Sequence, residues 1–131
     1  MRVKITAIKN KKGFFKVTPY KTIDSDTHDD FREKIKPLLV KSTRHITLDL
    51  EKVDYISSAG LGVIFLMKKT LASNGGRLIL YRPKPHIHRL FEVVKHMLKD
   101  TLYHSIEEAD AYLDQVMKDE LSKQRRNSKK R

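Results

Sequence analysis

Residues 47–63 read TLDLEKVDYISSAGLGV, in which an alternating apolar strand leads through a short polar link to two serines and small residues. The alternation predicts a strand over Ile46–Leu50, and serine is a typical residue for the start of a helix. Such a helix start offers free backbone N–H groups and a positive dipole end, so it is a ready anion site. The segment therefore predicts a strand, a turn and a helix whose first turn is able to hold a phosphate.

Strand and helix patterns alternate along the rest of the chain. Further strands are expected at 3–7, 14–18, 78–81 and 102–104, and helices are expected to begin after Thr27, Ser57 and Ser105 and at Pro85. Residues 20–26 are interpreted as a loop, and Pro37 is expected to kink or end the first helix near Lys36. The order ββαβαβαβα indicates the α/β class, with a mixed sheet of about five strands and four helices.

Length and composition restrict the class of protein. A chain of 131 residues suits one domain, and the absence of cysteine excludes disulfides, thiolate metal sites and cysteine nucleophiles. No apolar run approaches the roughly 18 residues of a membrane helix, and the N-terminus lacks the apolar centre of a signal peptide. We therefore expect a cytoplasmic protein without membrane insertion.

The positive charge is concentrated at the C-terminus. The net charge is +12, and residues 122–131 hold six Lys and Arg and no acid. This segment has almost no apolar side chains, so we expect a domain over 1–121 and a disordered basic tail over 122–131. Such a tail is able to hold nucleic acid electrostatically. No aromatic residue is interleaved to stack a base, which favours a solubilising role.

Residues 48–62 carry a resemblance to a known family. L-D-L, five further residues and then I-S-S-A-G-L-G resemble the signature of the STAS family, the sulfate-transporter and anti-sigma-factor-antagonist domain. Ile23-Asp24-Ser25 is similar to the family's turn before the first helix, and Asn74–Leu78 is similar to its second-helix stop and next strand. The resemblance spans about Val3 to Met117 and implies the STAS-like fold.

The resemblance also implies a function and a set of residues. The family's regulatory serine falls on Ser58, and an unphosphorylated domain of this kind binds an anti-sigma factor. That partner is often a serine kinase, whose phosphorylation of the serine ends the interaction, and a serine phosphatase reverses it. The implied partner-binding residues are Asp24, Ser25, Ser57, Ser58, Ala59, Gly60, Leu61 and Gly62. No enzyme activity and no cofactor are implied.

The sequence departs from the family pattern beside the regulatory serine. Ser57 stands where the family often has an acid, which makes it a competing phosphate acceptor, and Ala59 replaces a frequent serine or threonine. Serines at a helix start also serve simply as N-caps, so the residue chemistry alone leaves phosphorylation open. The switch requires a Ser58 that a kinase is able to reach.

Other interpretations remain open or are excluded. The alternatives are a STAS scaffold without phosphorylation, such as an accessory subunit of a transporter, and a nucleic-acid binder that uses the tail.

His86 and His88 lie two residues apart on an expected helix, so they do not share a face, and we expect no metal site. Ser58 lacks the G-x-S-x-G elbow of a nucleophile.

Overall fold

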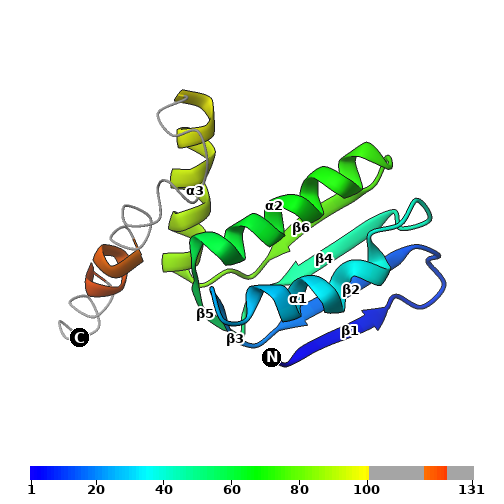
Figure 1. The fold of residues 1–131 in the computed structure, drawn as a ribbon, viewed down its shortest axis with the longest axis horizontal. Helices are drawn as coiled ribbons and strands as arrows, with labels where there is room; N and C mark the ends of the chain where they lie inside the picture. Colours follow the sequence, from blue (N-terminus) through cyan, green and yellow to red (C-terminus); the bar gives the residue numbers. More distant parts are fainter. Residues whose placement is uncertain (101–116, 124–131) are drawn as a thin grey trace.

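A four-stranded sheet forms the centre of the molecule (Figure 1). The structure is a computed structural model that describes residues 1–100 and 117–123. The strand order in this sheet is β1-β2-β4-β6, formed by β1 (Val3–Ala7), β2 (Phe14–Pro19), β4 (His45–Asp49) and β6 (Arg77–Tyr81). β1 is antiparallel to β2, whereas β2, β4 and β6 are mutually parallel. The α/β class and the mixed sheet are thereby confirmed.

The hairpin between β1 and β2 turns on a glycine. Gly13 has a φ of +79°, and a Cβ built on it would lie 2.4 Å from the backbone oxygen of Ser42. Glycine alone adopts this left-handed conformation without strain and leaves room for the neighbouring loop. The turn before β2 therefore closes against the segment that enters β4.

Two short strands form a second, parallel sheet. β3 (Lys21–Ile23) pairs with β5 (Val53–Ile56), and the backbone N–H of Lys21 donates to the oxygen of Lys52 at 2.8 Å. The sequence analysis was wrong to read residues 20–26 as a loop throughout. Three residues show no alternation long enough to recognise, and only the pairing with β5 fixes their extended conformation.

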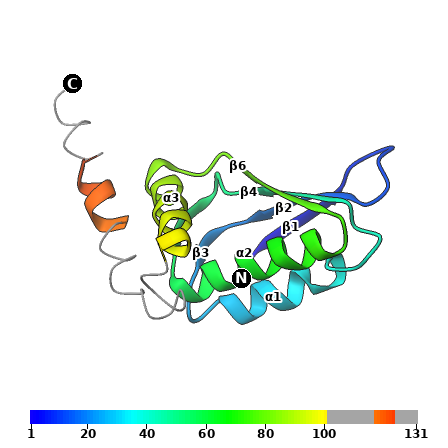
Figure 2. The same ribbon diagram turned by 90° about the horizontal axis from the view of Figure 1, so that it is seen from above.

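Helices α1 and α2 cover one face of the central sheet, as Figure 2 shows. The helical segments of residues 1–100 are α1 (His28–Ile35), the 3-10 turn η1 (Lys36–Leu38), α2 (Ser58–Ser73) and α3 (Pro85–Asp100). Pro37 lies in η1, so the first helix ends just before it, as predicted. Gly75, with a φ of +77°, follows the end of α2 in the left-handed conformation that commonly ends a helix.

The start of α1 differs in detail from the expectation. Thr27 is the N-cap residue, but its side chain makes no capping hydrogen bond. Its hydroxyl instead donates to the oxygen of Thr22 at 2.9 Å and accepts from the backbone N–H of Asp24 at 2.9 Å. The hydroxyl therefore ties the turn after β3 together rather than the helix.

The hydrophobic core lies between the sheet and its two covering helices and continues to buried side chains of α3, among them Ile87 and Leu90. Ile46 and Leu48 of β4 are fully buried, and so are Phe31 of α1 and Leu61 and Met67 of α2.

No helix in the described part of the chain has the length and apolarity that crossing a bilayer requires. Residues 117–123 are helical. The expected strand at 102–104 and the first part of the last expected helix lie outside the described residues.

Candidate functional site

The two serines singled out in the sequence open helix α2. Ser57 is the N-cap residue, with extended backbone angles of −86° and 175°, and its Oγ accepts a hydrogen bond from the Gly60 N–H at 3.3 Å. Ser58 is the first residue of the helix. Ser57 therefore satisfies one of the free N–H groups of the first turn, and the serine pair lies at the positive end of a sixteen-residue helix.

The two serines differ in accessibility. Ser58 is only 9% exposed, whereas Ser57 is half-buried. Ser58 as a whole is nearly buried in this conformation, so its modification by an enzyme requires the surrounding surface to move. Ser57 is the more accessible of the two hydroxyls, and only side-chain packing, which the sequence does not record, distinguishes them.

Close packing brings the turn after β3 against the start of α2. A Cβ built on Gly60 would lie 2.3 Å from the backbone oxygen of Ile23, and the same oxygen accepts a hydrogen bond from the Ser57 N–H at 2.9 Å. Only a residue without a side chain allows this approach. The turn at Asp24 and Ser25, which directly follows Ile23, therefore lies beside the serines.

This turn is shaped by the carboxylate of Asp24. Its Oδ1 accepts from the backbone N–H groups of Asp26 at 2.9 Å and Thr27 at 3.1 Å. Ser25 is exposed, while Asp24 is half-buried. The Asp24 side chain thus holds the turn in place, and Ser25 is the residue of the pair whose side chain is open to a partner.

Two of the predicted partner-binding residues belong to the core instead. Leu61 is fully buried, and Gly60 is buried beneath the oxygen of Ile23. Leu61 points inward because it lies on the face of α2 that covers the sheet. These two residues position the site, and neither is available to a partner in this conformation.

A shallow groove between α1 and α2 extends the site beyond the predicted residues. It has a volume of about 460 Å³ and is lined by His28, Arg32, Ala59, Gly62, Val63 and Leu66. Leu66 is a large apolar side chain that is 40% exposed. Sequence reasoning found Ala59 and Gly62 but missed His28, Arg32 and Leu66. The available signal was spacing, because Ala59, Gly62 and Leu66 follow i, i+3, i+7 on one side of α2.

Charged groups on α1 border this groove. The guanidinium of Arg32 pairs with the carboxylate of Asp29, and Nε2 of His28 lies 3.3 Å from the same carboxylate. The α1 side of the groove is therefore polar, while its α2 side is apolar or bare. Apolar surface bordered by polar groups is typical of protein-binding surfaces.

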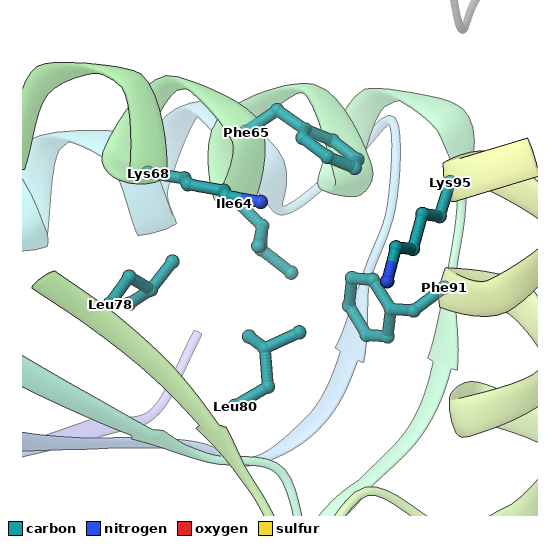
Figure 3. Close-up of a pocket in the computed structure, with 7 residues that line it drawn as sticks. All are labelled: Ile64, Phe65, Lys68, Leu78, Leu80, Phe91 and Lys95. Carbon is teal, nitrogen blue, oxygen red and sulfur yellow. The ribbon is translucent and has the colours of Figure 1, made fainter. Parts of the chain in front are cut away.

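A second concave surface lies between α2, β6 and α3 (Figure 3). It encloses about 380 Å³, and its walls are mainly apolar, with the lysines Lys68 and Lys95 reaching over it. Ile64, which is 2% exposed, joins its floor to the core. None of the residues predicted from the sequence as partner-binding lines this surface.

The histidines of α3 are separated, as their spacing predicts. Nε2 of His86 lies 2.6 Å from the backbone oxygen of Asp54 and the residue is 4% exposed, whereas His88 faces Glu92 at 3.5 Å. Across residues 1–100 and 117–123, no three His, Cys, Asp or Glu side chains gather in a way that could hold a metal ion.

Comparison with known proteins identifies the class. The model of the STAS domain family matches residues 6–109, so the chain belongs to this family. The anti-sigma-B factor antagonist of Staphylococcus aureus is 32% identical over 90 residues, which cover 69% of this chain and 82% of that protein. The putative anti-sigma factor antagonist BtrV of Bordetella bronchiseptica is 37% identical over 71 residues, which cover 54% of this chain and 61% of that protein.

Solved structures share the fold at lower identity. A putative anti-sigma factor antagonist from Thermotoga maritima has a TM-score of 0.64 at 23% identity and covers 85% of this chain and 93% of that one. Unphosphorylated SpoIIAA, an anti-sigma factor antagonist, has a TM-score of 0.59 at 18% identity, and the match covers 70% of this chain and 82% of that one. The anion transporter Slc26a9 of the mouse has a TM-score of 0.55 at 19% identity, and the match covers 67% of this chain and 14% of that one.

Proposed function

We propose that the protein is an anti-sigma factor antagonist, a non-enzymatic cytoplasmic switch that binds an anti-sigma factor when it is unphosphorylated. The contact surface consists of the start of α2, the turn at Asp24 and Ser25, and the groove between α1 and α2. An anti-sigma factor with serine kinase activity modifies Ser58 and is released, and a serine phosphatase restores the binding form. Ser57 is the alternative acceptor.

One geometric observation carries this proposal. The turn after β3 lies against the start of α2, because Gly60 lets Ile23 approach so closely, and Ala59, the residue next to Ser58, lines the α1–α2 groove. A partner that fills the groove over Ala59 and Gly62 therefore covers the helix start as well. A change of charge at the serines would then lie within the contact rather than beside it.

The names of relatives favour this function over a transporter scaffold. The fold occurs both in SpoIIAA and in the anion transporter Slc26a9, so the fold does not distinguish the two. The relatives from Bordetella bronchiseptica and Staphylococcus aureus, at 37% and 32% identity, are named as antagonists of anti-sigma factors. SpoIIAA has been solved in an unphosphorylated and a phosphorylated form, which supports a phosphorylation switch in this fold.

Charge and burial explain how a phosphate would release the partner. A phosphoserine carries a charge of about −1.5 to −2 and three strong acceptor oxygens. At the start of α2 the helix donors would hold the phosphate without melting the helix. The partner would have to bury an unpaired dianion, which is costly. The limited space around Ser58, which is 9% exposed, adds a displacement of the neighbouring surface.

A binding measurement with matched variants tests the proposal. Titration calorimetry of the full chain with the anti-sigma factor of the same cell should give a Kd that Ser58→Ala leaves within about threefold. Ser58→Asp should weaken binding about a hundredfold, which corresponds to about 2.7 kcal/mol. Ser73→Asp, the same change near the other end of α2, is the control and should leave the Kd unchanged. Equal binding by Ser58→Asp and the wild type would contradict the switch.

A further inference from the structure

The central sheet has a second face, which none of the described helices covers (Figure 2). Helices α1 and α2 lie on the face that carries Ile46 and Leu48. Side chains alternate along strands, so the register places Phe14, Lys16, His45, Arg77 and Tyr81 on the other face. We call these residues, together with Lys4 on β1, the open sheet face.

Each of three neighbouring strands contributes one ring to the open sheet face. Phe14 of β2 stacks on His45 of β4, with ring centroids 5.1 Å apart and an angle of 14° between the planes. Arg77 of β6 is the register partner of His45, so a ring, an imidazole and a guanidinium lie in one row across the sheet. Tyr81, farther along β6, is 45% exposed.

Cations surround these rings. The Lys11 ammonium lies 5.4 Å from the centroid of Phe14, and the Arg82 guanidinium lies 4.9 Å from that of Tyr81. Residues 1–23, which include β1 and β2, contain seven Lys and Arg and no Asp or Glu. The hairpin segment is therefore strongly positive, and Lys4 and Lys16 are the cations that its strands place on this face.

The acid on this face is already neutralised. Asp49 is 3% exposed, and its Oδ2 lies 2.8 Å from Nη2 of Arg82 and 3.4 Å from Nζ of Lys16. The neighbouring Glu51 also pairs with Arg82, at 2.7 Å. The open sheet face therefore presents rings, hydroxyls and cations to solvent, and no unpaired carboxylate within the described residues repels an anion.

We propose that the open sheet face binds single-stranded nucleic acid. A base would stack on Tyr81, the most exposed of the three rings, while Lys4, Lys11 and Arg77 contact the phosphates. Exposed aromatic residues on a four-stranded sheet are one of the recurring ways in which proteins hold unpaired bases, because every base has a π-face. The face is too polar to insert into a bilayer, and its excess of cations disfavours a second copy of the same face.

This site is independent of the proposed antagonist function. The α1–α2 groove lies on the helical side of the sheet, whereas the open sheet face lies on the opposite side (Figure 2). Nucleic acid and an anti-sigma factor would therefore have separate surfaces. Failure of one proposal leaves the other standing, because each is tested with its own ligand and its own variants.

Fluorescence anisotropy of the full chain with labelled single-stranded RNA and single-stranded DNA of about 12 nucleotides tests the proposal. We expect saturable binding that weakens with salt, with a slope near −0.7 for each phosphate contact. Tyr81→Ala should weaken binding by about tenfold, and Tyr81→Phe should restore it, because stacking needs only the ring. Arg77→Ala should lower the affinity and reduce the salt slope. The charge-matched control is Lys68→Ala, on the concave surface of Figure 3, and it should leave both the affinity and the salt slope unchanged.

Several results would overturn the proposal. If Tyr81→Ala and Phe14→Ala leave the affinity unchanged, the binding is purely electrostatic and involves no stacking. If deletion of residues 127–131 alone abolishes binding, the binding site is the tail. Duplex DNA bound as tightly as the single strands would exclude base stacking. Preferential binding to vesicles of anionic lipid would indicate a membrane surface instead. The two single-stranded probes distinguish RNA from DNA as the ligand.

Discussion

At the scale of single residues, Asp49 shows how a buried charge is made tolerable. Burial alone would raise the pKa of Asp49. Hydrogen bonds from Arg82, from the Glu51 backbone N–H and from Lys16 outweigh the burial, so its pKa lies below the ordinary range. A carboxylate whose pKa is lower in the folded state stabilises the fold above its unfolded pKa of about 3.9. That contribution is lost as the pH falls through the folded pKa.

The corresponding prediction concerns acid unfolding. Asp49→Asn removes the titrating group, so the difference in the free energy of unfolding between wild type and variant should be largest near pH 6. The difference should shrink as the pH falls below about 3.9. Urea unfolding followed by circular dichroism across this range measures it. Asp26→Asn, at an exposed carboxylate, is the control, and a difference independent of pH would contradict the account.

The serines show what a sequence pattern conveys at this scale and what it does not. Their position at a helix start follows from local chemistry, since serine readily caps N–H groups and small residues follow. The burial of Ser58 does not follow, because it depends on atoms that come close only in the folded chain. The approach of Gly60 to Ile23 is a contact of the same kind, across 37 positions of sequence.

At the scale of elements, the start of α2 depends on its cap. The Oγ of Ser57 accepts from the Gly60 N–H, so Ser57→Ala should lower the free energy of unfolding by about 1 kcal/mol. Ser57→Asp keeps an acceptor at the N-cap and should remain near the wild-type stability. Thermal and chemical unfolding of both variants measure the difference. Equal loss in the two variants would show that the cap bond does not support the helix.

The two short strands β3 and β5 were not predicted from the sequence pattern, unlike the longer elements. β1 and β4 show alternation, β6 is a short apolar run, β2 follows a turn, and α2 carries its own start and stop, so these were predicted. β3 and β5 have three and four residues with polar side chains among them, and each is extended because the other pairs with it. Pro37 was recognisable because its effect on a helix is local.

At the scale of the whole molecule, the exposed leucine in the α1–α2 groove links the fold to partner binding. Leu66 is 40% exposed and lies at the edge of a surface over Ala59 and Gly62. Leu66→Ala should weaken binding of the anti-sigma factor by about tenfold, because a partner that covers this exposed apolar side chain removes its surface from water. Surface plasmon resonance measures the change.

A matched control separates this effect from stability. Val40 is another exposed apolar residue, at 44%, and it lies after η1, outside the groove. Val40→Ala should leave the affinity unchanged, and both variants should keep the unfolding free energy within about 0.5 kcal/mol of the wild type. Equal weakening by the two changes would show that the groove is not the docking surface.

The arrangement of the molecule assigns separate roles to its surfaces. One side of the sheet holds the core, the helices and the serine site, and the other carries rings and cations. The fold class was predictable because strand and helix patterns alternate along the chain. The groove and the open sheet face were not, since both arise from residues that meet only when the sheet forms.

The most direct test is to phosphorylate the full chain with its kinase, map the modified residue by mass spectrometry and measure the Kd of both forms for the anti-sigma factor. The account predicts a single phosphate on the peptide spanning residues 53–68, at Ser58, and an affinity about a hundredfold lower than that of the unmodified form. A phosphate elsewhere in the chain, or equal affinities of the two forms, would contradict it.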